Sequence, residues 1–142
     1  MKKFIVLALV LVALAAAFFV AEGFLDAMLR GGSSASSARR LADVSRRMNA
    51  KLPKPLDQAT RLDTTTAGPG NRFTYICTLV NYSKDELDLA VFTAEMKSQI
   101  INTYKTKPEM AWLRNQQVEL RYQYRDKNGV DVVTIAVSPK DF

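Results

Sequence analysis

The stretch Arg72-Phe-Thr-Tyr-Ile-Cys-Thr-Leu-Val-Asn81 decides the fold, because its side chains alternate between two faces as those of a strand do. The Ala67-Gly68-Pro69-Gly70-Asn71 segment before it is a strong turn signal. Before the turn, Thr60–Thr66 is rich in β-branched threonine, which favours a second strand. Together these segments predict a β-hairpin in which one face of the later strand carries Phe73, Tyr75, Cys77 and Leu79.

A helix is predicted on each side of this hairpin. Upstream, Arg39 to Leu52 has apolar residues at helical spacing and is followed by Pro53, which ends a helix. Downstream, Ser83-Lys84-Asp85-Glu86 has the pattern of a capping box, which predicts a helix from there to about Lys105. The expected buried stripe of this second helix consists of Leu89, Phe92, Met96, Ile100 and Tyr104.

A second hairpin is predicted near the C-terminus. Gln117–Arg125 and Val130–Val137 alternate in the manner of strands, and Asp126-Lys127-Asn128-Gly129 between them has Asn-Gly turn chemistry. The order helix, hairpin, helix, hairpin predicts an α+β domain over residues 39–142. We expect a four-stranded antiparallel sheet that two helices cover on one face.

The N-terminal region reads as a membrane segment. Residues 4–21 form an uninterrupted apolar run after Lys2 and Lys3, and as a helix these residues would rise about 27 Å, enough for a hydrocarbon core. A transmembrane helix over 1–30 and a flexible Gly/Ser tether over 31–38 are therefore predicted. The alternative is a cleaved signal peptide ending at Ala17, which would leave Phe18-Phe19 at the mature terminus.

The flanking charges bear on membrane orientation. Lys2 and Lys3 favour a cytoplasmic N-terminus, although Arg30, Arg39 and Arg40 nearly balance them on the other flank. The very short N-terminal tail favours an exported C-terminal domain. The expected location is the inner membrane, single-pass, with the domain in the periplasm.

The composition leaves few means of catalysis. The 142 residues include 20 Lys+Arg, 14 Asp+Glu, one cysteine and no histidine, which excludes histidine-based triads, histidine metal ligands and intrachain disulfides. Cys77 falls mid-strand and reads as a buried, inert thiol. Asp85, Glu86 and Asp88 read as capping residues at a helix start. We predict no enzyme, no cofactor and no metal site.

Two basic groups are candidate binding surfaces. Arg39, Arg40, Arg46 and Arg47 recur at a seven-residue interval after the anchor, where they could contact lipid head groups or form a solvated helix face. Arg72, Arg121, Gln123 and Arg125 are predicted on an open sheet face, as a protein-docking surface or an ordinary solvated face. Nucleic acid is disfavoured, because Tyr122 and Tyr124 alternate to the opposite face and build no stacking platform with the arginines.

The chain also resembles a group of small exported or membrane-anchored bacterial proteins of uncharacterised function. The shared pattern is N-x-x-L-P from Asn49, D-x-x-T-x-L from Asp57, Y-x-Y-x-D-x-x-G from Tyr122 and P-x-D from Pro139. The resemblance covers about residues 45–142 and implies an envelope location, without site residues to transfer. Those proteins often carry two cysteines where this chain has Lys105 and Phe142, so this chain lacks the disulfide that the resemblance implies.

These observations favour a membrane-anchored, non-catalytic binding or assembly module of the bacterial envelope, acting as an accessory subunit with a protein partner. One alternative is an envelope inhibitor or immunity protein. Another is a cytoplasm-facing basic domain that binds lipid or nucleic acid.

Overall fold

The computed structural model describes residues 37–142, so the predicted membrane segment and most of the tether lie outside the described residues. Within 37–142, no helix is both long and apolar enough to cross a membrane. The helices are α2 (Ser37–Asn49), α3 (Leu89–Thr106) and α4 (Ala111–Asn115), with 3-10 turns at Lys84–Glu86, Pro108–Met110 and Pro139–Asp141. The strands are β1 (Lys54–Pro55), β2 (Thr60–Ala67), β3 (Arg72–Leu79), β4 (Glu119–Arg125) and β5 (Asp131–Val137).

The α+β class is confirmed, but the sheet is five-stranded and mixed rather than four-stranded and antiparallel. The strand order is β1-β2-β3-β4-β5. Both predicted hairpins form, whereas β3 and β4 pair in parallel, from Arg72 beside Glu119 to Thr78 beside Arg125. The reason is the crossover: α3 carries the chain back along the sheet before β4 begins, and a helical crossover of this kind makes adjacent strands parallel.

The additional strand, β1, is only two residues long and pairs with β2 at the edge of the sheet. Pro55 fits this position, since proline cannot donate to a ladder and is tolerated at an edge. Two residues are too few for any alternation, so the sequence pattern carries no signal for β1.

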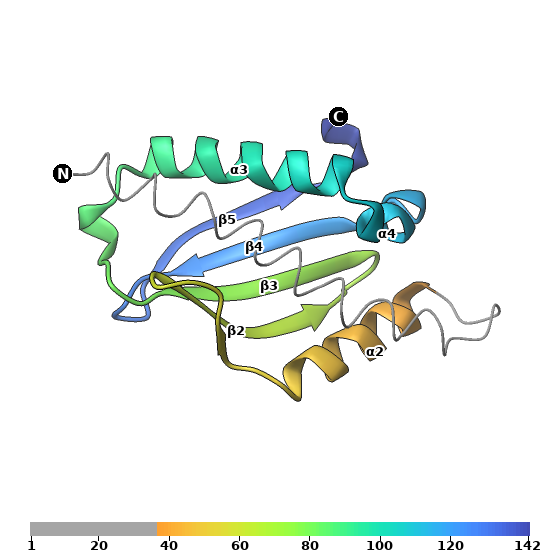
Figure 1. Cartoon of the computed structure of the whole chain (residues 1–142), viewed down its shortest axis with the longest axis horizontal. Helices are drawn as coiled ribbons and strands as arrows, with labels where there is room; N and C mark the ends of the chain where they lie inside the picture. Colours follow the sequence, from red (N-terminus) through yellow and green to blue (C-terminus); the bar gives the residue numbers. More distant parts are fainter. Residues whose placement is uncertain (1–36) are drawn as a thin grey trace.

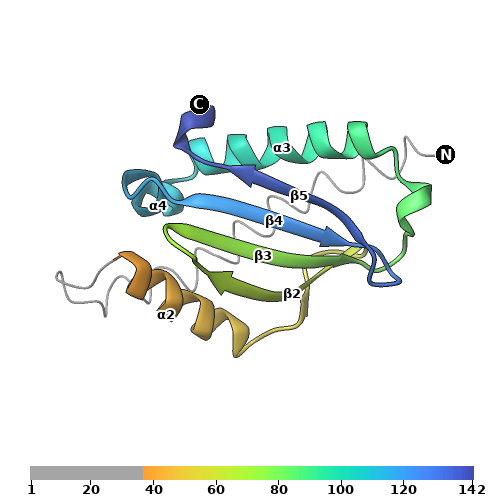
Figure 2. The ribbon, with the colours of Figure 1, turned by 180° about the vertical axis from the view of Figure 1, so that it is seen from behind.

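Both long helices contact the same face of the sheet. On α2, the Ser45 hydroxyl lies 2.9 Å from the hydroxyl of Thr65 in β2. On α3, the Phe92 ring meets the ring of Tyr124 in β4 edge to face, with centroids 5.2 Å apart. Figure 1 shows α2 along β2 and α3 along β5, and Figure 2 shows the same arrangement from behind.

The core follows the predicted alternation. Phe73, Tyr75, Cys77 and Leu79 of β3 are all buried on the helix side, together with Leu120, Tyr122 and Tyr124 of β4. Tyr75 and Tyr122 stack with ring centroids 4.6 Å apart. Burial of these large side chains supplies the main driving force for folding the sheet onto its helices.

The second helix starts later than the capping box predicts. The box does form, with the Ser83 N–H donating to the Glu86 carboxylate at 3.0 Å, but it closes a 3-10 turn. Leu87 then adopts an extended conformation and is buried, which interrupts the helix before Asp88 caps α3. Because Leu89 is exposed, the buried stripe begins at Phe92.

The C-terminus returns to α3. The Phe142 ring lies against the Tyr104 ring, with centroids 5.6 Å apart, and Tyr104 directly precedes Lys105 in the chain. Lys105 and Phe142, the two positions where the resembling proteins often carry cysteines, therefore lie in one region of this fold.

Candidate protein-docking face

The sheet presents a polar face on the side away from α2 and α3. Its members are the alternate residues of β2, β3 and β4 that point away from the core, with Ile76 as the apolar exception. We call this surface the polar face; it comprises Arg61, Asp63, Thr64, Thr66, Arg72, Thr74, Thr78, Glu119, Arg121, Gln123 and Arg125.

The strand register brings the predicted docking residues together. On β3 and β4, Thr74 lies beside Arg121, Ile76 beside Gln123, and Thr78 beside Arg125. Arg72 lies beside Glu119 at the end of the same pair of strands. All four predicted residues thus share one face, and each β4 member is partly exposed.

Ion pairs offset most of the positive charge of the polar face. Glu119 accepts a hydrogen bond from Arg72 at 2.8 Å and lies 3.3 Å from Arg121. The Arg72 hydrogen bond holds the pKa of Glu119 below its usual value. Arg125 lies 3.7 Å from Asp131, so the surface has alternating charges rather than a row of free cations.

Sequence reasoning did not include Arg61 and Asp63 in this face. These two β2 residues form an ion pair with a nitrogen–oxygen distance of 2.5 Å, and the Thr78 hydroxyl donates to Asp63. A register shift between Leu62 and Thr64 breaks the alternation of β2, so periodicity alone could not assign a face to its residues.

The second predicted group, on α2, is divided by the structure. Arg39 and Arg46 are exposed, whereas Arg40 and Arg47 are half-buried. Asp43 pairs with both Arg46 and Arg47, and the Arg40 guanidinium lies over the Trp112 ring, 5.7 Å from its centroid. Of these four arginines, only Arg39 and Arg46 are therefore well exposed.

Cys77 and the acidic residues that precede α3 have structural roles. Burial raises the pKa of the Cys77 thiol far above its usual value, as expected for an inert core thiol. Hydrogen bonds from Ser83 lower the pKa of both Asp85 and Glu86. Asp88 caps α3 through the Val91 N–H, as its predicted capping role requires. Among residues 37–142 no group of three His, Cys, Asp or Glu side chains is placed to hold a metal ion.

Asp126 is a buried acid whose role is also structural. Its carboxylate accepts hydrogen bonds from the backbone N–H groups of Lys84, Asn128 and Val130 at 2.8–2.9 Å. Burial alone would raise its pKa, but these backbone donors outweigh that effect and lower it. Asp126 therefore ties the β4–β5 turn to the segment that precedes α3.

Residues 36–133 match the family described as "Domain of unknown function (DUF8479)". The chain belongs to this family. The match spans α2 and most of the sheet, and therefore includes the polar face. A search of curated protein sequences found no match.

Three solved structures share the fold at low sequence identity. A protein from Pseudomonas aeruginosa that is provisionally classed as secreted has a TM-score of 0.60 at 14% identity, covering 71% of this chain and 88% of that one. The type II secretion system pilotin AspS from Vibrio cholerae has a TM-score of 0.54 at 16% identity, covering 78% and 100%. The pilotin EpsS of the Vibrio vulnificus type 2 secretion system has a TM-score of 0.56 at 15% identity, covering 73% and 93%.

Proposed function

We propose that this chain is a non-catalytic assembly module of the bacterial envelope that binds a protein partner through the polar face. The observation that carries the proposal is the polar face itself, which lies on the side of the sheet away from α2 and α3 and has a defined pattern of charges. The likeness of the fold to two pilotins and to a protein classed as secreted supports an envelope location and a role in assembly.

The charge pattern favours a protein as the partner. Arg72, Glu119 and Arg121 form one half-exposed cluster, and Arg125 with Asp131 forms another. Alternating charges of this kind match a partner surface of complementary pattern, which gives specificity and register. A polyanion such as nucleic acid would instead meet repulsion from Glu119, Asp63 and Asp131.

The apolar run over residues 4–21 supplies the anchor in this proposal. It would cross the inner membrane once and hold the domain on the periplasmic side through the tether over 31–38. Arg39 and Arg46, the exposed arginines of α2, lie only a few residues after that tether. Each basic residue near an anionic surface contributes about 1 kcal/mol, so these two would keep α2 close to the head groups.

The proposal is tested by co-purification from solubilised native membranes, with a tag at the C-terminus. We expect the wild-type chain to retain an envelope protein that the double variant Arg121→Glu/Arg125→Glu loses at least tenfold. The matched control is Lys97→Glu/Lys105→Glu, the same charge change at two exposed positions of α3. Circular dichroism establishes that each variant folds. Equal recovery of the partner by both double variants would count against the polar face, and recovery of no partner by the wild type would overturn the proposal.

A further inference from the structure

The four arginines of the polar face all form their ion pairs through Nε. The nitrogen–oxygen pairs are Arg72–Glu119 at 2.8 Å, Arg121–Glu119 at 3.3 Å, Arg61–Asp63 at 2.5 Å and Arg125–Asp131 at 3.7 Å. Within residues 37–142, no hydrogen bond comes from the terminal nitrogens, Nη1 and Nη2, of these side chains. Because Nε holds only one of the N–H donors of a guanidinium, the remaining donors of each arginine stay available to a partner.

Glu119 brings two of these guanidinium groups together. Both Arg72 and Arg121 bond to the same carboxylate oxygen, Oε2. The three side chains carry two positive charges and one negative charge, so Glu119 neutralises only half of the positive charge around it. All three are between 30 and 34% exposed, so a partner can reach them. The pair of arginines thus suits one further carboxylate, whose two oxygens match the planar fork of a guanidinium.

Arg125 offers a second cation near the other end of β4. It lies four residues beyond Arg121 on the same side of the strand, a separation of about 13 Å. Its side chain is 41% exposed, and that of its neighbour Asp131 is 79% exposed. An ion pair this open to solvent contributes little, so a carboxylate of a partner can compete for Arg125.

A row of uncharged residues crosses the sheet between these two cations. Its members, one from each of the four longer strands in register, are Thr64, Ile76, Gln123 and Thr134. Gln123 lies midway between Arg121 and Arg125. Along β4 the polar face therefore presents a cation, a neutral residue and a second cation, about 7 Å per step.

We propose that the polar face binds an extended acidic segment of its protein partner, in which two carboxylates four residues apart bind the terminal nitrogens of Arg121 and Arg125. An extended chain rises by the same distance per residue as β4, about 3.3 Å. Carboxylates at positions i and i+4 then lie opposite the two arginines, and the residue at i+2 lies on the neutral row. Arg72 shares the first carboxylate with Arg121. The inference rests on the proposed docking at the polar face and specifies the chemistry of the partner.

The spacing of charges distinguishes such a segment from a polyanion. Each strand of duplex DNA carries one negative charge about every 3.4 Å. A chain with that charge density would place phosphates on the neutral row and beside Glu119, where no unpaired cation meets them. Two separated carboxylates instead place their charge only at the arginines.

Synthetic peptides test the spacing on the full chain purified in detergent. The probe is a nine-residue peptide of serine and alanine with blocked ends, a fluorophore and glutamate at its positions 3 and 7. One control moves the second glutamate to position 5, and another is a dodecamer of thymidylate. By fluorescence anisotropy we expect the 3/7 peptide to bind at least fivefold more tightly than either control. Equal affinity for the 3/5 peptide or the oligonucleotide, or no binding of the 3/7 peptide, would overturn the inference.

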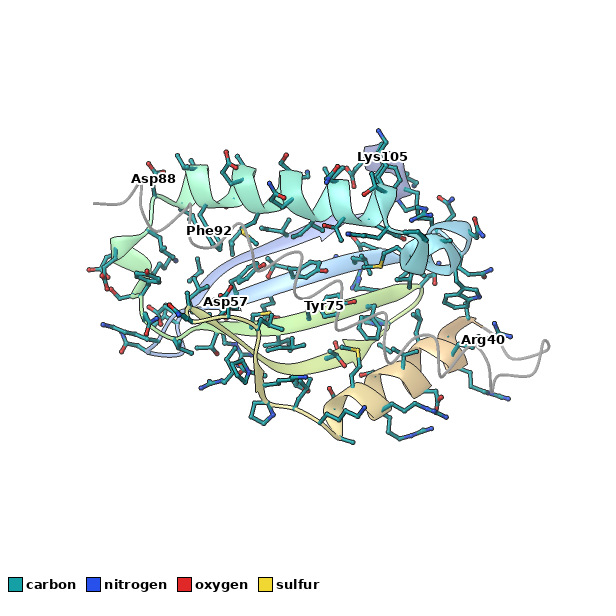
Figure 3. All side chains as sticks on the ribbon, viewed as in Figure 1. Arg40, Asp57, Tyr75, Asp88, Phe92 and Lys105 are labelled. Carbon is teal, nitrogen blue, oxygen red and sulfur yellow. The ribbon has the colours of Figure 1, made fainter. Side chains whose placement is uncertain are left out.

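Substitutions separate recognition by the guanidinium fork from attraction by charge. Arg121→Lys/Arg125→Lys keeps both positive charges but removes the paired donors, so the Kd of the 3/7 peptide should rise at least fivefold. The matched control is the reverse exchange, Lys97→Arg/Lys105→Arg, at two exposed positions of α3. Figure 3 shows Lys105 near the C-terminal end of that helix. Circular dichroism establishes that both variants fold. Wild-type affinity in the folded Arg121→Lys/Arg125→Lys chain would overturn the inference.

The inference and the proposed function fail in different ways. Loss of the native partner by Arg121→Glu/Arg125→Glu, without any preference among the peptides, would leave docking at the polar face standing and overturn only the acidic segment. Binding of the 3/7 peptide without recovery of any partner from native membranes would overturn the proposed function, and with it the assignment of this site to a protein partner.

Discussion

At the scale of single residues, Asn49 links α2 to the sheet. Its side-chain amide hydrogen-bonds the backbone of Thr65 in β2, as the backbone of a neighbouring strand would. Its side-chain oxygen accepts a hydrogen bond from the Thr65 N–H at 2.8 Å, and its side-chain nitrogen donates to the Thr65 carbonyl at 2.9 Å. The two-residue β1 pairs only with Arg61 and Leu62, so no strand from residues 37–142 lies beside the outer edge of β2 at Thr65. The Asn49 amide takes the place of the missing peptide group, satisfying backbone groups that burial would otherwise penalise.

We expect Asn49→Ala to lower the free energy of unfolding by about 2 kcal/mol, because the Thr65 N–H loses its partner in a half-buried position. Asn49→Asp should also destabilise the fold, since a carboxylate can accept from the N–H but cannot donate to the carbonyl. Urea unfolding of the full chain in one detergent measures both changes. The control is Asn102→Ala on the exposed side of α3, expected to stay within about 0.5 kcal/mol of wild type. An equal loss at Asn102 would show that the Asn49 contacts contribute nothing specific.

At the scale of elements, local sequence patterns predicted the strands and the hairpin turns, which local chemistry determines. Alternation located β3, β4 and β5, and the Gly68-Pro69-Gly70 and Asn128-Gly129 turns located both hairpins. Sheet order across α3 depends instead on which end of the sheet the chain returns to, and no local pattern encodes that. The same holds for Leu87, whose burial interrupts the helix that Ser83 and Glu86 would otherwise begin.

The interruption at Leu87 predicts unequal roles for two capping residues. Asp88 accepts from the Val91 N–H at the true start of α3, so Asp88→Ala should cost about 1 kcal/mol, as the loss of an N-cap usually does. Ser83 caps only an exposed 3-10 turn, so Ser83→Ala should cost less than half as much. Urea unfolding of the two variants under the same conditions compares them directly. A larger loss for Ser83→Ala would mean that the early turn and α3 fold as one helical unit.

At the scale of the whole molecule, the sequence predicted the β4 members of the polar face and Arg72, but neither its β2 members nor how far its charges are neutralised. The alternation of β4 alone places Arg121, Gln123 and Arg125 on one face. The neutralising contacts lie across strands, since Arg72 meets Glu119 only because β3 and β4 pair in that register. The arginines counted along the sequence therefore overestimate the net positive charge of the polar face.

The alternation of β4 also predicts that a change on its polar side leaves its buried side unaffected. Side chains alternate along a strand, so Arg121 and Arg125 point away from the side on which Tyr122 and Tyr124 are buried. Changes on opposite faces share no side-chain partners, and their effects should be separable. We expect Arg121→Glu/Arg125→Glu to lose the co-purified partner while Cys77, which is buried on the opposite face, stays as slow to react with N-ethylmaleimide as in wild type.

The wild-type chain and this double variant are compared in both measurements, the recovery of the partner and the rate at which N-ethylmaleimide labels Cys77. If the variant kept its cooperative thermal transition and Cys77 nevertheless became reactive, the two faces would be coupled through β3 and β4. The sheet would then transmit a change on its docking surface to its core instead of separating the two.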